Sequence, residues 1–134
     1  MKAALIGAAL KSHLAALTFS PAIPVAWPNR DFKPTGDHMT AAIVPAEAQR
    51  LGVKAMHRFA GTLVVTVCTQ GGRGSGEGDG KADAVAGHFP ADLRLNLSDG
   101  GTLRITQAAS VREGFIDAGY WRTPILIPFE VLTA

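Results

Sequence analysis

The sequence predicts an α+β fold in which two helices pack on a mostly antiparallel or mixed sheet of five to six strands. Three observations support this fold class: apolar residues at helical spacing near the N-terminus, several runs that alternate apolar and polar residues, and an Asp-Gly turn between two of those runs. The chain has 134 residues, which is enough for one hydrophobic core. We therefore expect residues 1–134 to form a single domain.

The first expected element is a helix over residues 2–17. Its apolar face is formed by Ile6, Leu10, Leu14 and Leu17. The same segment also resembles a secretory signal, because Lys2 precedes an apolar run. Lys11 interrupts that run and helical periodicity continues beyond it, so the amphipathic helix is the favoured interpretation.

An extended arm is expected to follow, because half of the eight prolines lie between residues 21 and 34. Proline fixes φ and lacks an amide donor, so this segment suits neither a helix nor a central strand. The arm carries apolar residues that include Trp27 and Phe32. These side chains need burial, either on the chain's own domain or on a neighbouring subunit.

Two strands are expected next, over residues 39–44 and 57–70. The second is apolar on both faces, which is typical of a central strand. The residues between them, 46–56, are ambiguous and favour a helical turn that Gly52 ends.

Residues 71–80 read GGRGSGEGDG, and two readings stay open: a flexible loop, or a loop that becomes ordered only against a partner. A phosphate-binding loop is not supported, because Ala82 follows Lys81 where Ser or Thr is needed. A second helix is expected over residues 81–89, with Asp79 as its N-cap and Pro90 at its end.

The C-terminal part reads as paired strands. Residues 93–97 and 103–105 flank the turn at Asp99-Gly100, and a further pair is expected over 111–115 and 120–131. Pro124 and Pro128 have the same parity, so both missing amides face the same side of the last strand. We therefore expect 120–131 to be an edge strand.

The residue types give no support for catalysis, a metal site or a cofactor. The single Cys68 is expected to pack as a small apolar side chain, and the four histidines lack metal-ligand spacing. Charged residues make up 18% of the chain, the net charge is +2, and no Lys/Arg-rich stretch marks a dedicated nucleic-acid binder. No apolar run is long enough for a transmembrane helix.

The order of these segments resembles the small tail terminator proteins of long-tailed, siphovirus-type bacteriophages, prophages and gene transfer agents. The resemblance covers about residues 2–130 and rests on the following segments: HLAAL at 13–17, PVAWPN at 24–29, FKP at 32–34, RFAGTLVVTV at 58–67, the Gly-rich run, residues 82–90, the Asp99-Gly100 turn and GYWRTPI at 119–125. The Gly-rich run holds more glycine than is typical of that family.

The resemblance implies a non-enzymatic virion tail protein that is assembled in the host bacterial cytoplasm. It implies a homohexameric ring that caps the head-proximal end of the tail tube, ends tube polymerisation and joins the head. The implied partners are the major tail tube protein, the head-completion or stopper protein and the tape-measure protein, while DNA passes through the lumen without specific binding.

Our hypothesis for the subunit or partner interface comprises Trp27, Phe32, Arg73, Gly74, Gly76, Pro124 and Pro128. Two alternatives remain open from the sequence. One is another head–tail connector or tail-completion ring protein, and the other is a small intracellular enzyme subunit in which the Gly-rich run forms a lid.

Overall fold

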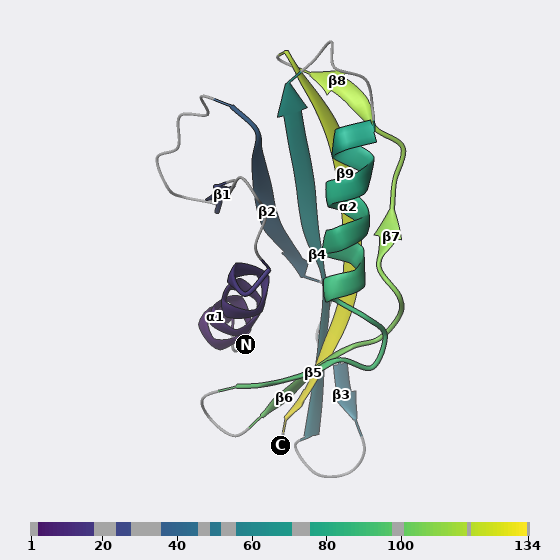
Figure 1. Cartoon of the computed structure of the whole chain (residues 1–134). Helices are drawn as coiled ribbons and strands as arrows, with labels where there is room; N and C mark the ends of the chain where they lie inside the picture. Colours follow the sequence, from purple (N-terminus) through teal and green to yellow (C-terminus); the bar gives the residue numbers. More distant parts are fainter. Residues whose placement is uncertain are drawn as a thin grey trace.

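A computed structural model of the chain describes residues 3–17, 24–27, 36–45, 49–51, 56–70, 76–97, 101–117 and 119–133. It confirms the α+β class: two helices pack on a mixed sheet (Figure 1). In chain order the described elements are α1 (Ala3–Ala15), β1 (Val25–Ala26), β2 (His38–Pro45), β3 (Gln49–Leu51), β4 (Met56–Gln70), α2 (Gly76–His88), β5 (Arg94–Asn96), β6 (Thr102–Ile105), β7 (Ser110–Val111), β8 (Phe115–Asp117) and β9 (Tyr120–Thr133).

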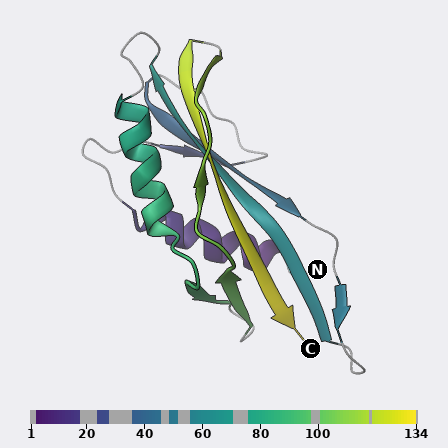
Figure 2. The same cartoon turned by 90° about the vertical axis from the view of Figure 1, so that its right-hand side faces the viewer.

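The sheet is built around the antiparallel pair of β4 and β9, whose register runs from His57 opposite Thr133 to Gln70 opposite Tyr120. The strand order is β1-β2-β4-β9-β6-β5, with β3 paired to β4 and with β7 and β8 paired to β9. Figure 2 shows β4 and β9 as a long twisted ribbon that continues past the helices. The central position expected for residues 57–70 is confirmed.

The expectation that the last strand lies at an edge is wrong, because β9 has neighbours on both sides. On one side it pairs with β4, and on the other it pairs in turn with β8, β7 and β6. The two prolines fall where this second side is interrupted. The Pro128 carbonyl accepts from the Thr106 amide at 3.1 Å, and the Pro124 carbonyl accepts from the Arg112 amide at 2.8 Å. Both prolines do face the same side of β9, as expected. Three short strands occupy that side, and the gaps between them fall at the prolines.

Both helices cover the same face of the sheet. Residues of odd number in β4 and β9 point to this face, and Leu63, Val65, Ile125 and Ile127 are fully buried there. α1 contributes Ile6, Leu10 and Leu14, α2 contributes Ala82 and Val85, and Phe89 follows directly after α2. Figures 1 and 2 show α2 lying alongside β4 and β9 on this face. The apolar face expected for the first helix is confirmed at these three α1 positions, and Leu17 packs half-buried beyond the helix end.

The second helix begins earlier than expected. α2 starts at Gly76 and ends at His88, so the second half of the Gly-rich run is helical and Asp79 lies inside the helix as an exposed residue. The N-cap expectation for Asp79 is therefore wrong. The close approach of Gly78 to the sheet explains the difference: a Cβ there would lie only 3.1 Å from Trp121 Cδ1. Packing against the sheet thus overrides the low helix propensity of glycine.

Two other expectations change in the N-terminal half. Residues 49–51 form β3 beside the start of β4 rather than a helical turn, because the backbone of β4 offers them a pairing edge. In the arm, Val25 and Ala26 pair in parallel with Met39 and Thr40. Residues 21–23 and 28–34 of the arm lie outside the described residues, as do residues 46–48, 52–55 and the turn at 98–100.

Candidate assembly surfaces

The middle of the sheet face opposite the helices is uncharged across β2, β4 and β9, and the charged residues Arg122 and Glu130 of β9 lie at its two ends. We call it the open face and define it by Thr40, Ala42, Val44, Thr62, Val64, Thr66, Pro124, Leu126 and Pro128, which the strand registers place side by side. Val44 is 56% exposed, Ala42 is exposed, and the others are half-buried. A face of small apolar and hydroxyl side chains has little affinity for ions and is well suited to contact with another protein surface.

A second apolar surface lies at the opposite side of the sheet from β2. Among the described residues, the exposed large hydrophobic side chains are Val44, Val111, Phe115 and Ile116. The last three belong to β7 and β8, and we call them the β7–β8 edge. In the described part of the chain both strands pair with β9 alone, so their outer backbone edge is available for pairing. Phe115 and Ile116, at 48% and 60% exposure, point to opposite faces of the sheet.

Four of the seven proposed interface residues lie in the described part of the chain, and two of these four lie on the open face. Pro124 and Pro128 lie on the open face and are half-buried. Trp27 is half-buried and packs against the chain's own core, so this part of the arm lies on its own domain. Gly76 is the first residue of α2. Phe32, Arg73 and Gly74 lie outside the described residues, and the surface role of all seven residues stays a prediction.

Beneath the first turn of α2 lies a cluster of buried polar groups that the sequence reasoning missed. Thr69 Oγ1, Thr123 Oγ1 and Trp121 Nε1 are buried and have no hydrogen-bond partner among the described residues; we call them the polar cluster. They come from β4 and β9, on the face that the helices cover. Gly114 packs on the indole, where a Cβ would come within 2.5 Å of Trp121 Cε2. The sequence signal for this cluster was the pair of glycines at positions 78 and 114, since a glycine can mark a site of close approach.

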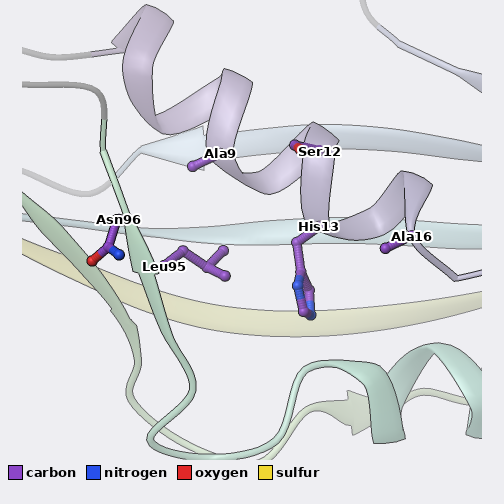
Figure 3. A pocket seen from close by; sticks show the side chains of 6 residues that line it. All are labelled: Ala9, Ser12, His13, Ala16, Leu95 and Asn96. Carbon is purple, nitrogen blue, oxygen red and sulfur yellow. The ribbon is translucent and has the colours of Figure 1, made fainter.

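The two helices are joined at their C-terminal ends by a pair of histidines. His13 and His88 stack with their ring centroids 4.0 Å apart. His13 also borders a shallow groove of about 330 Å³ between α1 and β5, together with Ala9, Ser12, Ala16, Leu95 and Asn96 (Figure 3). Small side chains form most of this groove, and it brings no cluster of acids, bases or nucleophiles together.

The single thiol lies on the face away from the helices, next to a cation. Cys68 is fully buried, and Arg122 Nη1 donates to its Sγ at 3.4 Å. Burial raises the pKa of the Cys68 thiol, and the charge and hydrogen bond of Arg122 lower it, with burial the stronger effect. The thiol is therefore held in its protonated form, which is a poor nucleophile. The expectation that Cys68 packs as a small apolar residue agrees with this burial.

The described residues contain no group of three or more His, Cys, Asp or Glu side chains that could hold a metal ion. Neither of the described helices is both long and apolar enough to cross a membrane. The candidate surfaces of the described residues are therefore the uncharged open face and the apolar β7–β8 edge, and two helices cover the other face of the sheet.

Comparison with known proteins gives this class of protein a name. The family model for the phage tail terminator protein matches residues 5–129. One solved structure is similar to this chain with a TM-score of 0.83 and 26% identity, over 100% of this chain and 98% of that chain. No curated protein matches the chain significantly.

A match over nearly the whole chain shows the family. The chain belongs to the phage tail terminator family, as the resemblance in its sequence indicated. Its role is that of a structural component of a phage tail, and this family suggests a non-enzymatic protein of the virion tail.

Proposed function

We propose that this protein forms a homohexameric ring that caps the head-proximal end of the phage tail tube. The ring ends polymerisation of the tube and presents the surface on which the head is joined. The observation that carries the proposal is the family match over residues 5–129. The placement of apolar surface on the subunit supports it.

A closed ring of identical subunits needs two different surfaces that fit one another, one on each side of the subunit. The β7–β8 edge and the β2 side of the open face are candidates for these two surfaces, because β2 and the β7–β8 edge lie on opposite sides of the β4–β9 pair. Among the described residues, Val44 is the large exposed apolar side chain on the β2 side. The two surfaces do not overlap, so one subunit can use both at once.

The tail partners in this proposal are the major tube protein on one side of the ring, the head-completion protein on the other, and the tape-measure protein that sets the length. DNA passes through the lumen without being held. An uncharged surface such as the open face suits that passage, since each Lys or Arg that neutralises a phosphate adds to nonspecific affinity.

The proposal is tested by removing the gene from a cell that produces the particle and imaging the tails. Without the protein, tubes are expected to exceed the normal length, to vary in length and to lack heads. Wild-type protein supplied from a plasmid is expected to restore uniform, head-joined tails. Tails of normal length that join heads in the absence of the protein would contradict the proposal.

A further inference from the structure

The first turn of α2, residues 76–80, differs from the rest of the helix in both sequence and contacts. It reads GEGDG, so three of its five residues are glycine. Each glycine lowers helix stability relative to alanine, because it leaves more backbone freedom in the open state. The side chains that anchor α2 in the core, Ala82, Val85 and Phe89, all follow this turn.

The first turn of α2 packs on buried polar groups to which it gives no hydrogen bond. A Cβ on Gly78 would lie 3.2 Å from Thr123 Oγ1 and 3.3 Å from Thr69 Oγ1, so the glycine backbone sits directly against both hydroxyls. Thr69 is 1% exposed and Thr123 is 0% exposed, and in the described part of the chain neither hydroxyl has a hydrogen-bond partner. The indole Nε1 of Trp121 is buried beside them and likewise finds no hydrogen-bond partner within the described ranges. Buried polar groups without partners favour any state in which they reach water or a partner.

We propose that the first turn of α2 is a latch that opens locally while the remainder of the helix stays packed. Opening exposes the hydroxyls of Thr69 and Thr123 and the indole N–H of Trp121, which then hydrogen-bond to water or to polar groups of a docking protein. Two features weaken the closed turn. Its glycines lower its helix propensity, and the polar cluster beneath it has no hydrogen-bond partner among the described residues. This inference concerns the subunit itself and does not depend on the proposed ring.

The test is residue-resolved amide hydrogen exchange on the full-length protein. In an α-helix the amide of residue i donates to the carbonyl of residue i−4, so the amides of residues 80–82 report opening of the first turn. The amides of residues 86–88 report the packed second half. Helix ends fray in general, so the response to substitution carries the test rather than the wild-type rates.

The deciding variant is the double substitution Thr69→Val and Thr123→Val. It keeps the shape of both side chains and removes the unpaired hydroxyls. Protection of amides 80–82 is expected to rise at least threefold, with amides 86–88 changing much less. The matched control is Thr66→Val, on the same strand but on the open face, which is expected to leave the protection of amides 80–82 unchanged. Unchanged or reduced protection in the double variant would overturn the proposal, because the hydroxyls would then be neutral or would hold the turn closed.

A second variant separates local from global opening. Gly80 faces open space, so Gly80→Ala stabilises the helical turn without a clash. Protection of amides 80–82 is expected to rise about fivefold, which corresponds to the difference in helix propensity between glycine and alanine. Amides 86–88 are expected to stay within twofold. An equal rise in both groups would show that the turn opens only when the whole protein unfolds, and would overturn the latch.

Discussion

His13 and His88 each hydrogen-bond to the other's backbone. His13 Nε2 lies 2.6 Å from the carbonyl oxygen of His88, and His88 Nε2 lies 2.6 Å from that of His13. Since a carbonyl oxygen only accepts, both Nε2 atoms carry a hydrogen. Each histidine lies in the last turn of its helix, so the pair satisfies a terminal carbonyl of each helix and joins the two across 75 residues of sequence.

Substituting either histidine of this pair is expected to destabilise the fold by about 1–2 kcal/mol, because one hydrogen bond and the ring stacking are lost. The measurement is a double-mutant cycle of His13→Ala and His88→Ala by urea unfolding. We expect the two effects to be non-additive by about 0.5–1.5 kcal/mol. Strict additivity would show that the rings act independently.

Alanine at the tightly packed glycines is expected to destabilise the protein, whereas alanine at an open glycine is not. A Cβ at Gly61 would lie 2.9 Å from the backbone oxygen of Val44, and one at Gly114 would meet the Trp121 ring. We expect losses of about 1–3 kcal/mol at these two sites. The control is Gly87→Ala, which faces open space within α2 and should raise stability by up to ~1 kcal/mol. Thermal unfolding followed by circular dichroism distinguishes the two groups, and equal effects at all three sites would contradict the packing described.

Restoring an amide at residue 128 is expected to change little, because Pro128 falls in a gap of the ladder between β6 and β7. Pro128→Ala should change the free energy of unfolding by less than about 1 kcal/mol. The contrasting variant is Ile127→Pro, which removes an amide on the β4 side of β9 and a buried side chain. We expect it to cost more than ~3 kcal/mol and to prevent stable folding. If Pro128→Ala proved as damaging as Ile127→Pro, the gap would not be where the structure has it.

The Cys68 thiol is expected to react slowly with an aromatic disulfide in the native protein. Its pKa is raised in the folded state by burial, so the folded protein binds this proton more tightly than the unfolded chain. The stability that the thiol contributes is therefore present below its unfolded pKa and falls as the pH rises through the higher folded value, in the alkaline range. Stopped-flow labelling across pH 7–10 measures the rate at which the Cys68 thiol reacts. Rapid labelling at neutral pH would show that Arg122 outweighs burial.

The apolar surfaces give a prediction about assembly. Ile116→Asp places a charge on the β7–β8 edge at a site that is 60% exposed, so the monomer should fold while the proposed contact between copies is lost. Ala84→Asp places the same charge at an exposed position of α2 and is expected to leave assembly unchanged. Analytical ultracentrifugation of both variants, with circular dichroism to verify folding, provides the comparison. Equal assembly of the two would remove the β7–β8 edge from the interface.

Local patterns in the sequence were sufficient for the elements that carry their own periodicity. The face of α1 and the central place of β4 follow from residues such as Leu10 and Val65, whose spacing reflects burial. The place of β9 did not follow, because Pro124 and Pro128 show that one side is interrupted but not that short strands fill the intervals. The start of α2 at Gly76 was also missed. Gly78 is helical because of what it packs against, and a contact with β4 and β9 cannot be read from local propensity.

Some residues of the candidate surfaces could be predicted from the sequence, and others could not. Pro124 and Pro128 were singled out for their effect on pairing and lie on the open face. Phe115 and Ile116 were overlooked as surface residues, since alternation of apolar residues in a short strand does not tell an exposed edge from a buried one. Trp27 looked available for a neighbour, and its packing on the chain's own core became visible only in three dimensions.

The most direct test of the central claim, that this chain is the subunit of a ring, is the native mass of the purified protein together with negative-stain images of the same sample. With 14.0 kDa per chain, the account expects a species of about 84 kDa and six-fold rings with a central opening. A protein that stays monomeric at the highest soluble concentration and in the presence of tail tubes would contradict it.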